Sequence, residues 1–238
     1  MLYGINFDGK HSYKDMGYTM PAERDIGFPS KEKIIVKVPF SNAEYDFSGM
    51  YGSQTYTPRQ LKYTFNVLKR GNWTPQALHL EKTKLINWLM SSSGRKKLYD
   101  DDIPGYYFLA EVESESNFVD DFETGTLTVT FRAYPFMIAE LKEGNDIWDM
   151  FNFELDVAQS TNFSVKGTLK VTLFNAGAPE IVPEIMTSNR MTLIKEGITY
   201  LVPSGGIKDR NFVLKPGKNP IRIIGDGIIS FGFYKELI

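Results

Sequence analysis

The sequence predicts a mainly β protein in two parts, an α+β module followed by a small β-sandwich. Several stretches alternate apolar and polar residues, which is the period-two pattern of half-buried strands. One stretch has the period of an amphipathic helix, and a polar, turn-rich stretch separates it from a second group of strands. The chain has 238 residues, of which 42% are hydrophobic and 14% aromatic, so it has ample material for packed cores.

The expected strands of the first part lie at residues 61–67 and 126–133. Every second residue from Leu61 to Val67 is apolar, so these side chains share one face of the strand. The second part repeats the pattern at residues 169–173 and 229–233. The turn residues that punctuate the runs are Asn42, Gly125, Gly197, Gly205, Gly206, Pro216, Gly217, Asp226 and Gly227.

The expected helix begins after Thr74, a residue type that caps helix N-termini, and Pro75 suits the first helical position. Its apolar stripe is Leu78, Leu85, Ile86 and Leu89. It ends at Ser91–Gly94, whose glycine can take the left-handed cap conformation. Trp73 and Trp88 are expected to pack the helix onto a sheet.

A polar connector is expected at residues 139–152. Pro135 closes the preceding strand, and residues 140–149 are polar with a Gly-Asn-Asp turn. We therefore divide the chain into a first module at residues 1–140 and a second at residues 150–238.

Composition excludes several classes of protein. The net charge of −2 and the pI near 5.8 disfavour a duplex-binding protein, which needs clustered cations. The chain has no cysteine, so it can form no disulfide, which fits a reducing cytoplasm. The first residues do not resemble a signal peptide, and apolar stretches such as Leu85–Met90 are too short to cross a membrane.

The candidates for general base catalysis are the two histidines, His11 and His79. Ser12 follows His11 directly, but a catalytic pair must converge in space, and adjacency in sequence does not provide this. His79 lies on the polar part of the expected helix. We assign no catalytic residue here.

Two groups of acidic residues could carry chemistry. Asp100, Asp102, Gly105 and Glu111 match a calcium-loop spacing, but Pro104 stands where an oxygen ligand is needed. A solvated acidic turn is the preferred interpretation. Glu111, Glu113 and Glu115 share one strand face, as carboxylates do in jelly-roll glycosidases, although Ser114 and Ser116 interleave them. Half-polar strands are common, so a structural role is preferred.

Residues 94–97 also carry no ligand site. Gly94 and the three cations after it lack the pattern of a phosphate-binding loop, and they suit a helix C-terminus. No His or Cys pair has metal-ligand spacing. The sequence therefore indicates no cofactor and no metal.

Five segments together form a recognisable set. They are Tyr51-Gly52 with Arg59–Phe65; Trp73–Leu89; Lys97–Tyr107 running into Ala110–Val112; Gly125–Phe136; and Leu214–Ile221 followed by Gly225. In this order, across most of the chain, the set resembles the distal tail (Dit) proteins of long, flexible-tailed bacteriophages and related prophage tail components.

The resemblance implies a structural protein of the virion tail tip, assembled in the bacterial host cytoplasm. It implies a ring-forming N-terminal domain at residues 1–140 and a galectin-like β-sandwich at residues 150–238. Six copies would form a ring, alone or stacked on a second ring. The ring would join the major tail tube protein to the tail-associated protein and carry the adhesion apparatus.

One implied partner depends on a part that this chain lacks. Larger relatives carry carbohydrate-binding insertions, or a long arm that grips receptor-binding proteins. The second module here is compact, so direct capture of a receptor-binding protein is in question.

Two alternatives belong to other functional classes. One is a jelly-roll glycosidase that uses Glu111 with Glu113 or Glu115. The other is a carbohydrate-binding module for host attachment at residues 150–238. That module has no histidine, and the nearest tryptophan, Trp148, lies in the connector, so no stacking platform for a sugar is evident.

Overall fold

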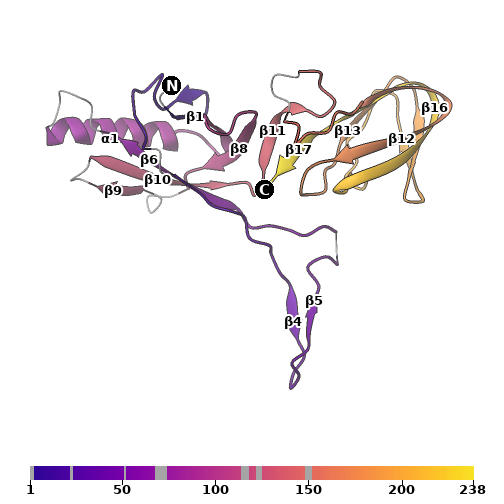
Figure 1. Ribbon diagram of the computed structural model, residues 1–238, viewed down its shortest axis with the longest axis horizontal. Helices are drawn as coiled ribbons and strands as arrows, with labels where there is room; N and C mark the ends of the chain where they lie inside the picture. Colours follow the sequence, from indigo (N-terminus) through magenta and orange to yellow (C-terminus); the bar gives the residue numbers. More distant parts are fainter. Residues whose placement is uncertain are drawn as a thin grey trace. The chain divides into compact units, whose positions relative to one another are not determined.

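The computed structural model describes residues 3–21, 24–50, 52–67, 74–113, 118–121, 125–147 and 152–238. The chain is mainly β, as the sequence predicts (Figure 1). It forms two compact units. The first comprises Met1–Met137 with Ile238, and the second comprises Ile138–Leu237. Residues 139–142, expected in the connector, belong to strand β11 (Met137–Lys142), in which Ile138 and Ala139 are buried.

The first unit is an antiparallel sheet covered by one described helix. Its strands are β1 (Ile5–Phe7), β2 (Lys10–His11), β3 (Asp25–Ile26), β6 (Arg59–Asn66), β7 (Lys96–Asp100), β8 (Tyr106–Glu111), β9 (Phe118–Asp121) and β10 (Thr126–Ala133). The strand order is β2-β1-β7-β8-β10-β6-β3, and β9 pairs with the end of β10 that β8 leaves free.

Strands β6 and β10 form the centre of this sheet. They pair along their whole length, with Val129 opposite Tyr63. Burial alternates along both strands, so the strands predicted at residues 61–67 and 126–133 are confirmed. The buried faces enter one core together with the helix.

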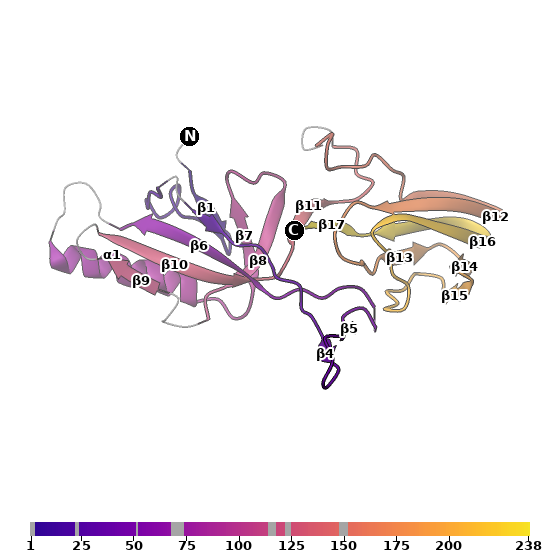
Figure 2. The same cartoon turned by 60° about the horizontal axis from the view of Figure 1, so that its bottom comes forward.

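Helix α1 (Pro75–Met90) lies along one face of the sheet, beside β6 and β10 (Figures 1 and 2). The predicted cap is confirmed, because the Thr74 hydroxyl accepts a hydrogen bond from the backbone N–H of Ala77 at 3.3 Å. Leu85 and Leu89 are buried, and Trp88 packs edge-on against Phe7. Trp73 lies outside the described residues. The helix is too short and too polar to cross a bilayer.

The second unit is built on one long strand, β16 (Gly217–Gly232). Its other strands are β12 (Asn162–Asn175), β13 (Glu184–Thr187), β14 (Met191–Lys195), β15 (Ile198–Val202) and β17 (Tyr234–Leu237), which pairs with β11. The sheet order is β12-β16-β14-β15, and β13 also pairs with β16 (Figure 2). The strands predicted at residues 169–173 and 229–233 fall within or beside β12 and β16.

Strand β16 bends between its two partners on one edge. It pairs with β14 at residues 222–224 and with β13 at residues 229–232. The bend requires glycine: Gly227 has a φ of +132°, and a Cβ there would lie 2.3 Å from the Ser188 hydroxyl. One strand therefore holds both partners.

The helix core generates a first prediction. Replacing Leu85 or Leu89 by Ala leaves a cavity under a buried face and should lower the free energy of unfolding by about 2–5 kcal/mol. Lys84→Ala, on the exposed face, should change it by at most about 0.5 kcal/mol. Urea denaturation of the three variants measures this, and equal losses at all three positions would contradict the assigned helix face.

Candidate functional site

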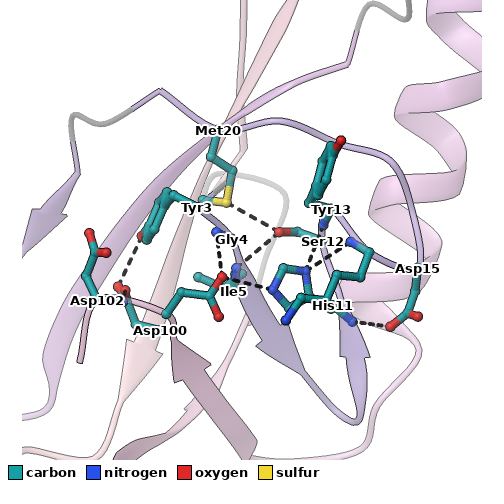
Figure 3. A network of polar contacts seen from close by, with 12 residues as sticks. Tyr3, Gly4, Ile5, His11, Ser12, Tyr13, Asp15, Met20, Asp100 and Asp102 are labelled. Carbon is teal, nitrogen blue, oxygen red and sulfur yellow. Dashed lines mark hydrogen bonds and ion pairs between the residues drawn. The ribbon is translucent and has the colours of Figure 1, made fainter. Parts of the chain in front are cut away.

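Several candidate residues from the sequence meet in one polar cluster of the first unit (Figure 3). Strands β1 and β2 bring His11 and Ser12 to the end of β7, where the Asp100–Asp102 turn begins.

Both ring nitrogens of His11 are engaged. Its Nδ1 accepts hydrogen bonds from the backbone N–H groups of Tyr13 at 3.0 Å and Lys14 at 3.1 Å. This assigns the ring proton to Nε2, which donates to Oδ2 of Asp101 at 3.1 Å. The ring closes the turn after β2, and it has no free nitrogen with which to accept a proton from a nucleophile.

The Ser12 hydroxyl also makes contacts that hold the fold together. Its hydroxyl oxygen accepts a hydrogen bond from the N–H of Ile5 at 3.1 Å, and the hydroxyl points toward the sulfur of Met20 at 3.5 Å (Figure 3). Among the described residues, it makes no hydrogen bond to His11. The pair is packed against Gly4, where a Cβ would lie 2.4 Å from the imidazole.

Asp100 is the centre of a second set of contacts, and its carboxylate is almost completely buried. One oxygen accepts hydrogen bonds from the hydroxyls of Tyr3 and Tyr63, each at 3.1 Å. The other accepts from the Arg24 guanidinium and from the backbone N–H of Asp102, each at 3.0 Å. Four donors from separate chain segments thus meet at one carboxylate.

Burial raises the pKa of the Asp100 carboxyl, although the N–H of Asp102, the charge of Arg24 and the two tyrosines act in the opposite direction. Burial likewise raises the pKa of Tyr63 above its ordinary value. Such shifts mark functional sites, but they also mark structural networks. Here every group already has a partner within the chain, which favours the structural role.

The calcium-loop spacing does not assemble an ion site. The Asp100 carboxylate already accepts hydrogen bonds from its four donors, and Asp102 pairs with Arg24 at 2.6 Å. Glu111, at the end of β8, lies 3.4 Å from Arg95. Within the described ranges, no group of three or more acidic or histidine side chains could hold a metal ion.

The proposed glycosidase carboxylates are paired with arginines. Glu113 lies 2.8 Å from Arg132, and Glu111 faces Arg95. Glu115 lies outside the described residues. His79 lies exposed on α1, where its carbonyl accepts a hydrogen bond from Thr83.

A different feature of the first unit has no partner within the described chain. Strands β4 (Ile35–Lys37) and β5 (Glu44–Asp46) pair only with each other, as a two-stranded ribbon (Figure 1). We call residues 33–48 the arm. Both strands of the arm are exposed along their whole length. An isolated two-stranded hairpin is at best marginally stable in water.

The two faces of the arm differ in chemistry. One face carries the ion pairs Lys33–Asp46 at 2.7 Å and Lys37–Glu44 at 3.3 Å. The other face carries Ile34, Val36, Tyr45 and Phe47, which are 39–58% exposed. This hairpin was not predicted from the sequence: Ile34, Ile35 and Val36 are consecutive apolar residues, and alternation is clear only after the turn at Asn42.

Comparison with solved structures gives a match over the whole chain. The crystal structure of the SPP1 Dit (gp 19.1) protein superposes with a TM-score of 0.63, covers 100% of both chains, and shares 11% sequence identity. That protein is described as a paradigm of the hub adsorption apparatus in phages that infect Gram-positive bacteria. The chain has a Dit-like fold. No family model and no curated protein matches its sequence.

The polar cluster around Asp100 predicts where the first unit is most sensitive to substitution. Asp100→Ala leaves buried donors, among them the Arg24 guanidinium, without their acceptor and should cost about 3–5 kcal/mol of stability. Asp102→Ala removes an exposed partner of the same arginine and should cost less than about 1 kcal/mol. Thermal and urea unfolding compare them. A larger loss for Asp102→Ala would overturn the assignment.

The raised pKa of Asp100 predicts a pH dependence. Because folding raises the pKa of Asp100, the ionised carboxylate lowers the stability of the folded state. This loss of stability disappears as pH falls through the folded pKa toward the unfolded value of about 3.9. The stability of the native chain relative to Asp100→Asn should therefore increase as pH is lowered from about 7 to about 4.5. Urea titrations at both pH values measure it, and a decrease would contradict the direction.

Proposed function

We propose that this protein is the structural hub of a phage tail tip. In this proposal six copies form a ring that joins the tail tube to the tail-associated protein and the adhesion apparatus. The observation that carries the proposal is the match to SPP1 Dit, which includes both units and leaves no part of either chain uncovered. A match limited to one unit would have suggested a shared domain only.

The arm supports assembly through the first unit. Its apolar face is exposed in the single chain, and burying such a face against another protein is favourable by about 25 cal/mol per Å². A second copy of this chain is the occupant that a closed ring provides, because each copy then gives one arm and receives another. The charged face, with its internal ion pairs, can stay in water.

The two alternatives have less support. A glycosidase needs two carboxylates that face one cleft, whereas Glu111 and Glu113 each pair with an arginine. A carbohydrate-binding module needs an exposed aromatic platform. In the described part of the second unit, the most exposed aromatic side chain is the single phenyl ring of Phe153, at 83%, whereas Tyr200 packs on Phe212 and donates its hydroxyl to the carbonyl of Asn211.

The arm offers a matched pair of substitutions to test assembly. Val36 and Ile35 are neighbours and are 49% and 48% exposed, but they lie on opposite faces. Val36→Lys places a charge in the apolar face and should reduce the ring to monomers. Ile35→Lys adds the same charge to the charged face and should leave the ring intact. Native mass spectrometry of the full chain reads out both.

Three outcomes would contradict this proposal. A wild-type chain that stays monomeric at tens of micromolar would remove the ring. A ring that tolerates Val36→Lys as well as Ile35→Lys would show that the arm does not form the contact. Closed assemblies with a number of copies other than six would overturn the sixfold symmetry.

A further inference from the structure

Strand β12 of the second unit has an open edge. It pairs with β16 along one side from residue 162 to residue 175. Phe174 shows which backbone groups face the other side, because its N–H and C=O both bond to the side chain of Gln159, at 2.8 and 2.7 Å. With a period of two, the backbone groups of Thr168, Lys170 and Thr172 point the same way.

Within the described residues, these edge groups have no hydrogen-bond partner. The side-chain amide of Gln159 occupies the edge only at Phe174, where it makes the pair of bonds that a neighbouring strand would make. At residues 168, 170 and 172, the outward backbone groups are spaced as in a β-ladder whose second strand is absent. Open edges of this length are sites of strand addition unless they are blocked.

The outward face beside this edge is basic. Lys170 lies opposite Arg222 in the register. Phe174 lies four residues after Lys170, on the same face, and is opposite Lys218, so Lys170, Arg222 and Lys218 share one face. They are exposed, as is Lys166, and none forms an ion pair with a described carboxylate. The only acidic residue in β12 and β16 is Asp226, opposite Lys166, and its carboxylate accepts a hydrogen bond from the N–H of Gly167 at 2.8 Å.

The inward face of the same edge is apolar. Leu169 and Val171 are half-buried and pack against the core of the second unit. A strand added to β12 would place alternate residues beside these side chains and the residues between them beside Lys170, with Arg222 on β16 one strand further away on the same face. The edge therefore favours an extended segment in which carboxylates alternate with apolar residues.

We propose that the open edge of β12 binds an extended, acidic segment of a partner protein by strand addition. The partner is another protein and not a second copy of β12. Antiparallel self-pairing would join the basic faces of two copies, so that Lys166 and Lys170 of both lie on one face of the joined sheet, and like charges there repel. The site lies in the second unit and is independent of the arm and of ring formation.

A synthetic peptide of four Glu-Val repeats, labelled with a fluorophore, tests the site by fluorescence anisotropy on the full chain. It should bind, and raising the salt from about 0.05 to about 0.5 M should weaken binding because exposed charges are screened. A Lys-Val peptide, and a Glu-Val peptide N-methylated at alternate residues, should both fail to bind. Equal binding by the N-methylated peptide would overturn strand addition.

Substitutions distinguish the contribution of the basic side chains to binding from that of the backbone hydrogen bonds. Lys170→Glu with Arg222→Glu should weaken binding at least about tenfold, whereas Lys208→Glu with Arg210→Glu, the same change in net charge outside β12 and β16, should not. Thr172→Pro removes an outward N–H and should also weaken binding, while Thr172→Ala should not. Far-ultraviolet circular dichroism confirms that each variant is folded.

Two further results would overturn the proposal. The first is the absence of measurable binding at about 1 mM chain, because the lysines would then only protect the edge from aggregation. The second is inorganic polyphosphate binding as tightly as the peptide and displacing it, because the surface would then recognise anions in general. The Val36→Lys variant should bind the peptide as the wild type does, so failure here is distinct from failure of the ring.

Discussion

The first unit depends on the burial of one carboxylate, that of Asp100. A buried charge is tolerated only where donors surround it, and here two tyrosine hydroxyls, a guanidinium and a backbone N–H do so. These donors come from the N-terminal segment, from β6 and from the turn after β7. One side chain therefore ties together segments at Tyr3, Arg24, Tyr63 and Asp102, in addition to the backbone ladder that pairs β1 with β7.

The sequence predicts the parts of this fold that local pattern determines. Alternation located the strands that became β6 and β10, and the cap at Thr74 located α1. Contacts between distant segments were not predictable in this way. Asp100 looked like part of a solvated acidic turn, because nothing in its neighbourhood reveals that Tyr3, Arg24 and Tyr63 converge on it from far along the chain.

The arm and the bend of β16 were missed for different reasons. The first strand of the arm begins with three consecutive apolar residues, Ile34, Ile35 and Val36, which does not indicate an amphipathic strand, and both strands are exposed. The bend was visible only as a turn signal at Asp226-Gly227. In the structure these residues lie inside one strand, because Gly227 adopts a conformation that lets β16 change partners without ending. Glycine in a strand and glycine in a turn look alike in sequence.

The amphipathic arm also affects a single copy of the chain before it joins the proposed ring. A newly folded copy exposes a ribbon of apolar side chains, and such a ribbon can associate with the wrong surface as readily as with the right one. In the proposed ring, association between copies is second order in concentration, so it is slowest when synthesis has just begun. The ion pairs across the opposite face and the short length of β4 and β5 limit mispairing during this interval. For the proposed assembly, the timing and amount of synthesis thus become part of the conditions under which this fold stays in solution.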